Sequence, residues 1–188
     1  MNAVGGHHNQ RMGARIDPTS FRRYFDEHYG FVCRVAEGIV CDRATAEDVA
    51  QDTFISLYRN PPRDPEQSIR GWLTVVAVNT ALNYLRRDKA RTRRETGAFE
   101  MDGRVTIQDA PLDEITKKED GELARQALRS LEDRERAVLV MRSAGLSYRE
   151  IARAVEVKET SVGTIIARAR LALRAAYARL GGSDDDVL

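Results

Sequence analysis

The chain has 188 residues, of which 42% are hydrophobic, 31% charged and only 6% aromatic, while Gly and Pro number 13 and 5. This length and balance exclude a large multi-domain enzyme and favour packed helices with charged surfaces over a β-sandwich or a disordered chain. The 30 Lys and Arg nearly balance the 29 Asp and Glu, for a net charge of +1, so any nucleic-acid site must come from local charge.

Two helices are predicted at the N-terminal end. Apolar residues recur every three or four positions over residues 21–40, which marks one face of an amphipathic helix, and Thr19 or Ser20 can serve as its N-cap. Thr45 and Asp48 have the spacing of a capping box for a second, short helix. That helix should end before an Asn-Pro-Pro sequence, because the residue before a proline disfavours helical geometry.

A third helix is predicted over residues 69–85, with Ser68 as its cap. Apolar residues cover most of its circumference, so we expect it to pack on more than one side and to form the centre of the first domain. One narrow face is polar, because four residues lie at positions i, i+4, i+7 and i+8. These residues are Asn79, Asn83, Arg86 and Arg87.

The charge changes sign abruptly after this helix. Residues 86–94, RRDKARTRR, contain six basic residues and one acid, whereas residues 95–122 contain nine acids and three bases. Residues 96–112 have little periodicity and several turn-forming residues, so we interpret them as a flexible linker. Two separately placed units follow from this interpretation.

The C-terminal part predicts four further helices, over residues 123–131, 134–142, 147–155 and 159–180. Gly145 marks the end of the second of these, and Ser147 with Glu150 forms a capping box for the third. The third helix has a predicted inward face, made of Tyr148, Ile151, Ala152 and Val155. A short helix, a tight connection and a longer helix are the arrangement of a helix-turn-helix DNA-binding unit.

The predicted fold is therefore all-α, with two small helical domains joined by a flexible linker and a helix-turn-helix in the C-terminal one. We divide the chain into a disordered N-terminal extension, a first domain, the linker, a second domain and an acidic tail. Their bounds are 1–18, 19–95, 96–112, 113–181 and 182–188.

Membrane, metal and catalytic functions are not expected. The longest apolar stretch, residues 73–85, is interrupted and falls short of the roughly 20 residues of a membrane span, and residues 1–19 lack the apolar core of a signal peptide. We therefore expect a cytoplasmic protein without membrane insertion. Cys33 and Cys41 are eight positions apart in one predicted helix, roughly 12 Å, which is too far for a disulfide. The histidines lack zinc-site spacing and catalytic motifs are absent, so we expect no metal, no cofactor and no enzyme.

The last predicted helix offers a surface for DNA. Its apolar residues Val162, Ile166, Ala169 and Leu173 should pack inward, which leaves a small, nearly smooth opposite face that can enter a major groove. The helix N-terminus also attracts a phosphate. A merely solvated face is the alternative. The candidate contacts are Lys158, Thr160, Gly163, Thr164 and Arg168.

The polar strip of the third helix and the basic run after it form a second candidate surface. Amides can hydrogen-bond exposed base edges while arginines hold the backbone. The alternative is a solvated helix end whose cations complement the helix dipole. The candidate contacts are Asn79, Asn83, Arg86, Arg87, Lys89 and Arg91.

Three segments in order resemble one family. They are AEDVAQDTF (46–54), IRGWLTVVAVNTALNYLRR (69–87) and LEDRERAVLVMRSAGLSYREIARAV (131–155). With them the chain resembles bacterial RNA polymerase sigma factors of the extracytoplasmic-function (ECF) type, in the sigma-70 family. The segments are similar, respectively, to the family's polymerase-docking helix, its promoter-melting helix and the start of its minus-thirty-five-binding domain.

The resemblance implies a transcription initiation factor whose partners are core RNA polymerase and promoter DNA. The first domain would dock on polymerase and open the minus-ten element, with Trp72 beside the melted strand, and the second would bind the minus-thirty-five duplex. An anti-sigma factor is a further partner that the family allows and no residue identifies. The residues implied to face polymerase are Glu47, Asp48, Gln51, Asp52 and Phe54.

The chain departs from the family pattern at four positions. Glu156 stands where members often carry Gly, Gly163 and Ile165 stand where basic residues are common, and Asn83 stands where many relatives have Asp. The predicted DNA-reading face is therefore less cationic than usual. Gly163 should also weaken its helix by about 1 kcal/mol relative to Ala, unless close approach of DNA requires it.

A stand-alone helix-turn-helix repressor or activator is the alternative function. It would explain the C-terminal half but leave the first half without a role. Such a protein normally binds palindromic DNA as a dimer. Binding of promoter DNA without core polymerase would distinguish it from a sigma factor.

Overall fold

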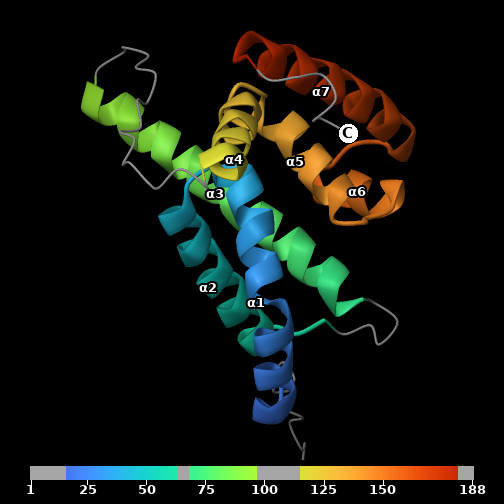
Figure 1. Cartoon of the computed structure of the whole chain (residues 1–188). Coiled ribbons are helices and arrows are strands. Elements are labelled where there is room, and N and C mark those ends of the chain that lie inside the picture. The colour runs from blue at the N-terminus through green and yellow to red at the C-terminus, as the bar shows by residue number, and fades with distance from the viewer. Residues whose placement is uncertain (1–15, 63–67, 97–114, 182–188) are drawn as a thin grey trace, which may run out of the picture.

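The computed structural model describes residues 16–62, 68–96 and 115–181, and in these ranges the chain forms seven helices and no strand (Figure 1). The prediction of an all-α fold is confirmed. The predicted N-terminal extension up to residue 15, the predicted linker from residue 97 and the acidic tail lie outside the described residues. The helices are α1 (Pro18–Val40), α2 (Arg43–Arg59), α3 (Ile69–Thr96), α4 (Ile115–Arg129), α5 (Asp133–Ser143), α6 (Tyr148–Ala154) and α7 (Glu159–Arg179).

Helix α1 is capped by Asp17, whose side-chain carboxylate accepts a hydrogen bond from the Ser20 backbone N–H at 2.9 Å. Pro18 follows at the first helical position, where a missing N–H costs nothing. The predicted N-cap, Thr19 or Ser20, is therefore wrong. Both residues lie inside the first turn, because the helix begins at Pro18, three residues before Phe21, where the apolar pattern starts.

Helix α2 follows α1 after a sharp turn. Cys41 ends α1 with a left-handed backbone conformation, φ 55°, and Asp42 then caps α2, its Oδ2 accepting a hydrogen bond from the Thr45 backbone N–H at 2.8 Å. The predicted capping box of Thr45 and Asp48 is wrong, because the cap is complete three residues earlier. Helix α2 ends at Arg59, as predicted.

The first three helices enclose the core of the N-terminal unit. Phe54 is 2% exposed, and its ring centroid lies 4.9 Å from that of Phe25 and 6.1 Å from that of Tyr29. Helix α3 contributes Leu73 and Val78, which are fully buried. This burial confirms the prediction that α3 lies at the centre of the unit.

Helix α3 extends well beyond its apolar part. The Gly71 backbone N–H donates to the Ser68 hydroxyl at 3.4 Å, which supports the predicted cap. The helix then runs without interruption to Thr96, so the whole basic run is helical. Its cations lie at the C-terminal end, where the helix dipole favours positive charge.

The four predicted C-terminal helices are present as α4 to α7. The capping box of α6 is confirmed, because the Ser147 N–H donates to the Glu150 carboxylate at 2.8 Å and the Glu150 N–H donates to the Ser147 hydroxyl at 3.3 Å. Gly145 adopts φ 93°, a conformation that favours Gly. The predicted inward face is partly wrong. Ile151 is fully buried, but Tyr148 is 42% exposed because it is the first residue of α6 and lies outside the core.

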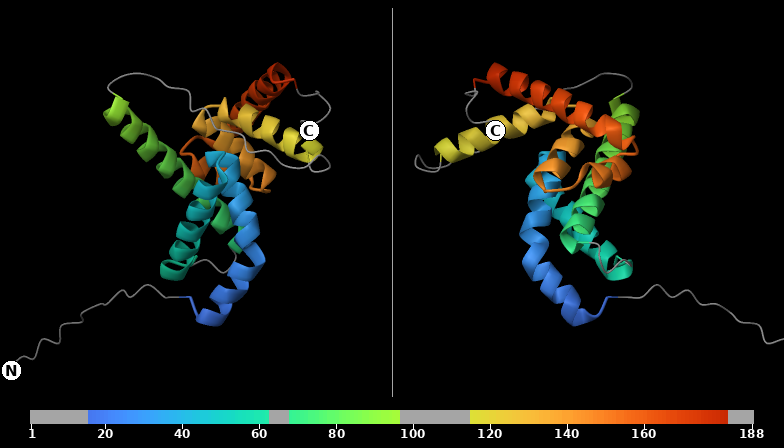
Figure 2. Two further views of the ribbon diagram at one scale, coloured as in Figure 1. Left: turned by 60° about the vertical axis from the view of Figure 1, so that its left-hand side comes forward. Right: turned by 90° about the vertical axis from the view of Figure 1, so that its right-hand side faces the viewer.

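The N-terminal and C-terminal units are in direct contact (Figures 1 and 2). Helix α5 packs against α1 and α3, and α4 packs against α1. The two units come close together at Gly38, where a Cβ would stand 3.0 Å from Cγ2 of Val140. Buried residues of both units form one continuous core. The two predicted units are therefore present, but they are not spatially separate in this structure, because residues distant in the chain pack together.

The cap of α2 gives a test of stability. Hydrogen bonds from Thr45 hold the pKa of Asp42 below its ordinary value of 3.8. Asp42→Ala should lower the free energy of unfolding by about 1 kcal/mol at neutral pH. Because the pKa is depressed in the folded state, this contribution is full above about pH 4 and is lost as the pH falls through the folded pKa.

Urea denaturation of the wild type and of Asp42→Ala, at pH 7 and at pH 3, measures the difference in the free energy of unfolding. Asp48→Ala is the control, since Asp48 is exposed on the same helix and caps nothing. Equal losses of stability in the two variants would contradict the assignment of the cap.

Candidate polymerase and nucleic-acid interfaces

The polar strip of α3 is exposed, as predicted. All four of its members face away from the core of the N-terminal unit. The Arg86 guanidinium donates to Asn83 Oδ1 at 2.9 Å, so the amide and the cation hold one another in place. Trp72 is half-buried and lies two turns before Asn79 on the same face.

The strip faces the C-terminal unit across a cavity of about 500 Å³. Asn79, Asn83 and Arg86 line one side of this cavity. Its other side comes from α5, α6 and the turn after α6, and includes Asp133, Arg134, Val155 and Glu156. The cavity is therefore lined by residues of both units.

The other two candidate contacts of the basic run, Lys89 and Arg91, already have partners. Arg91 pairs with Asp88 one turn earlier, at 2.9 Å. Lys89 pairs with Asp133 of α5, and the Nζ to Oδ2 distance is 2.7 Å. The Lys89 side chain nevertheless remains 64% exposed.

The helix-turn-helix is built from α6 and α7. The turn between them passes through Glu156, whose φ of 54° lies in the left-handed region that favours Gly. This conformation accounts for the residue type that the family often places there. The Val157 N–H donates to the Ala152 carbonyl at 3.0 Å and closes the turn.

The outer face of α7 has the small side chains that the sequence predicted. Thr160, Thr164 and Lys158 are exposed. Gly163 is half-buried, and a Cβ at this position would lie 3.5 Å from the Tyr148 ring, an ordinary contact distance. The protein's own packing therefore does not require a glycine there.

Arg168 lies at the edge of this face, beside α5. Its Nε is 2.6 Å from Oε1 of Glu135, a carboxylate that is largely buried. The Arg168 side chain remains 66% exposed, so it is oriented by Glu135 and still reaches solvent. This ion pair joins α5 to α7 and has no local sequence signal, since the partners are 33 residues apart.

Sequence reasoning missed further cations around the helix-turn-helix. Four additional arginines are exposed on α6 and α7, two on each helix and four residues apart. That spacing was the available signal, because residues at i and i+4 share a helix face. They are Arg149, Arg153, Arg170 and Arg174.

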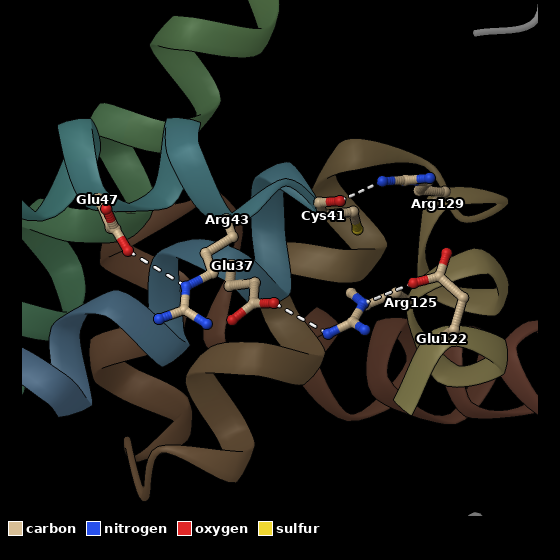
Figure 3. A network of polar contacts seen from close by, with 7 residues as sticks. All are labelled: Glu37, Cys41, Arg43, Glu47, Glu122, Arg125 and Arg129. Atoms are coloured by element: carbon tan, nitrogen blue, oxygen red, sulfur yellow. Dashed lines mark hydrogen bonds and ion pairs between the residues drawn. The ribbon is translucent and has the colours of Figure 1, made fainter. Parts of the chain in front are cut away.

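Four of the five residues predicted to face polymerase are exposed on α2. Glu47, Asp48, Gln51 and Asp52 point to solvent, and Glu47 pairs with Arg43 at 3.3 Å (Figure 3). The assignment of Phe54 to this face is wrong, because Phe54 is buried in the aromatic cluster of the core.

The cysteines are free thiols. Burial raises the pKa of the Cys33 thiol, although a hydrogen bond with Tyr29 acts in the opposite direction. Less thiolate at neutral pH makes a weaker nucleophile. In the described ranges no group of three or more His, Cys, Asp and Glu could hold a metal ion. None of the helices described combines the length and the apolar character needed to cross a membrane.

Comparison with known proteins assigns both units. Sigma-70 region 2 matches residues 24–91, and sigma-70 region 4 matches residues 121–173. The chain is 32% identical to the RNA polymerase sigma factor YlaC of Bacillus subtilis, over 82% of this chain and 87% of YlaC. It is 32% identical to the ECF RNA polymerase sigma factor SigL of Mycobacterium tuberculosis, over 86% of this chain and 89% of SigL.

Solved structures share the fold. The sigma factor RpoE, in complex with the anti-sigma factor NepR from Bartonella quintana, aligns with a TM-score of 0.66 at 18% identity, covering 84% of this chain and 96% of that one. CnrH, in complex with the cytosolic domain of CnrY, aligns with a TM-score of 0.56 at 20% identity, covering 85% and 88%.

An N-terminal three-helix unit with an exposed basic helix, joined to a helix-turn-helix unit, defines the architecture of a sigma factor. The chain belongs to the sigma-70 family, as an RNA polymerase sigma factor of the ECF type. It is a transcription initiation factor that directs core RNA polymerase to promoters. The resemblance found in the sequence is confirmed, and no comparison supports the stand-alone repressor or activator.

The strained turn of the helix-turn-helix gives a second test. Glu156→Gly should keep or raise the free energy of unfolding, by up to about 1 kcal/mol, because relief of the left-handed strain exceeds the added chain entropy of Gly. Glu156→Val should lower it by about 1 kcal/mol or more, since a β-branched residue tolerates this conformation poorly.

Thermal and urea unfolding of the wild type, Glu156→Gly and Glu156→Val gives their order of stability. Glu132→Gly is the control, because Glu132 has an ordinary φ of −60° and should gain nothing. An order in which the Val variant is as stable as the Gly variant would contradict the strain at this turn.

Proposed function

We propose that residues 19–95 dock on core RNA polymerase and open the minus-ten element, while residues 113–181 bind the minus-thirty-five duplex. The observation that carries this division is the presence of two separate exposed surfaces suited to nucleic acid, on α3 and on α7. The matches to sigma-70 regions 2 and 4 over the same parts of the chain support it.

Opening of the minus-ten element is a binding event. The amides of Asn79 and Asn83 can hydrogen-bond base edges only once the bases are unpaired, and Arg86 and Arg87 can hold the strand backbone. Each captured base contributes about 1 to 3 kcal/mol, comparable with the roughly 1.4 kcal/mol of a base-pair step. A few captured bases are therefore enough to keep a bubble open, with Trp72 beside the strand.

The minus-thirty-five element is read by α7 in the major groove. Thr160 and Thr164 offer hydroxyls to base edges or phosphates, and Gly163 permits close approach. Arg168, oriented by Glu135, adds a charged contact at the edge. Lys158 and the missed arginines of α6 and α7 supply phosphate contacts that position the helix without reading sequence.

The acidic face of α2 docks on core polymerase. Glu47, Asp48, Gln51 and Asp52 form a continuous exposed polar face over the α2 residues that pack in the core. Phe54 supports this face from beneath and makes no contact with polymerase.

The chain contributes no catalytic step of its own and acts in the cytoplasm, where polymerase and promoter are found. Two structural relatives are the sigma factor RpoE, in complex with the anti-sigma factor NepR, and CnrH, in complex with the cytosolic domain of CnrY. An anti-sigma factor that masks the docking face is a partner of the same kind for this chain.

Reconstituted transcription tests the function. Core polymerase with this chain should start transcription at a cognate promoter, and Asp52→Lys should reduce the transcript at least tenfold, because a cation replaces an acid at the docking face. Co-purification with core polymerase should fall in parallel, with unchanged helical content by circular dichroism. Asp26→Lys, the same change on exposed α1, is the control. Unchanged co-purification of Asp52→Lys would refute the docking assignment.

The minus-ten surface is tested by salt dependence. Arg87 is exposed, so Arg87→Ala should weaken open-complex formation about equally at different promoters and reduce the slope of log affinity against log salt by about 1. Filter binding of holoenzyme to promoters over a range of salt concentrations measures this. Arg22→Ala, at an exposed position of α1, should leave the slope unchanged. A slope unaffected by Arg87→Ala removes this residue from the surface.

A further inference from the structure

The cavity between the two units has an excess of positive charge in its walls. Its guanidinium groups come from three helices, with Arg86 on α3, Arg134 on α5 and Arg153 on α6. Because like charges repel, cations gathered around one space are unfavourable unless an anion lies between them. The net charge of the whole protein is only +1, so a general surplus of basic residues does not explain this gathering.

The carboxylates of the lining leave most of this excess in place. Asp133 accepts from Lys89 at 2.7 Å and from Arg136 at 2.8 Å, and neither of these cations belongs to the lining. The charge of Asp133 is therefore balanced from outside the cavity. Among the described residues of the lining, the other carboxylate is that of Glu156, in the turn after α6. Three guanidinium groups thus face the charge of Glu156 alone.

Two of the three guanidinium groups are held in place by the protein. Arg86 donates to Asn83 Oδ1 at 2.9 Å, and Arg134 donates to the Val155 carbonyl at 2.9 Å. A guanidinium carries several N–H donors, so each of these groups keeps donors for a ligand. Oriented guanidinium groups bind phosphate through paired, charge-assisted hydrogen bonds. The charged part of the cavity therefore favours a ligand with phosphate groups.

The rest of the lining suits a flat heterocyclic ring. Leu82, Ala154 and Val155 form its apolar part, and Leu82 and Val155 are buried. Asn79 and Asn83 contribute amides, which can donate to and accept from the edge of a base. The cavity volume of about 500 Å³ lies in the range of small-molecule sites, which combine an apolar lining with a few convergent polar groups.

We propose that this cavity is a binding site for a free nucleoside di- or triphosphate. The phosphates lie among Arg86, Arg134 and Arg153, and the base lies against Leu82 and Val155. The site goes beyond the proposed function, because it needs neither polymerase nor promoter. A free nucleotide fits better than a nucleic-acid strand, since a cavity of this volume has room for one small ligand and not for several linked nucleotides.

Equilibrium dialysis of the full chain against labelled ATP and GTP, without polymerase, tests the site. At least one of the two should bind with a dissociation constant below about 1 mM. Arg153→Ala should weaken this binding at least tenfold, because the phosphates lose one guanidinium. Arg22→Ala removes the same charge from an exposed position of α1 outside the lining, and it should leave binding unchanged. Absence of binding by both nucleotides, or equal losses in the two variants, overturns the proposal.

Two further probes separate the parts of the ligand. Inorganic tripolyphosphate carries the phosphates without a base, and it should bind at least tenfold more weakly than the nucleotide. A single-stranded oligonucleotide of the same base should also bind more weakly, because the cavity does not accommodate a strand. If either probe binds as tightly as the nucleotide, the site is a general polyphosphate or strand site and the proposal is wrong.

A neutral substitution tests the same site with every cation kept, in case Arg153→Ala fails to fold. Asn79 is exposed on α3, and Asn79→Leu removes an amide from the edge of the base. This variant should bind the nucleotide at least threefold more weakly and bind tripolyphosphate as the wild type does. Unchanged nucleotide binding, or equal losses for both ligands, contradicts the proposed site. None of these measurements uses polymerase, so their outcome is independent of whether the proposed function holds.

Discussion

The turn from α1 into α2 is the constraint on which the arrangement of the molecule depends. Cys41 adopts a left-handed conformation that ends α1, and Asp42 caps α2 at once, so the two helices fold back on each other around the aromatic core. The same residue presents its carbonyl to Arg129 and its thiol to Arg136. One backbone reversal therefore shapes the N-terminal unit and anchors the C-terminal one.

The helices could be predicted from sequence because their signals are local. Apolar spacing located each of the seven helices in the described residues, and Ser147 with Glu150 matched a capping motif that the structure contains. The caps of α1 and α2 were misplaced, because Asp17 and Asp42 precede the first apolar residue and lie outside the periodic pattern. Phe54 was assigned to the polymerase-facing residues by the resemblance alone, and it is buried because aromatic residues of α1 pack around its ring.

The sequence predicted the exposed faces of α3 and α7, but not the acidic residues that pair with their cations. Exposure of the α3 strip and of the α7 face follows from helical geometry alone. The partners of Lys89 and Arg168 do not, since Asp133 and Glu135 belong to a different helix and pair with them across 44 and 33 residues. Both carboxylates partly neutralise cations of the proposed DNA surfaces. The net charge of the whole protein is only +1. Such a protein has little tendency to bind nucleic acid indiscriminately.

Gly38 fixes how closely α1 and α5 pack. A methyl group at this position would meet Cγ2 of Val140 at 3.0 Å, so the Val140 side chain would have to move by a few tenths of an ångström. The position lies on neither proposed DNA surface and not on the acidic face of α2. A larger side chain there would therefore loosen the joint between the two units while every proposed contact surface keeps its own residues.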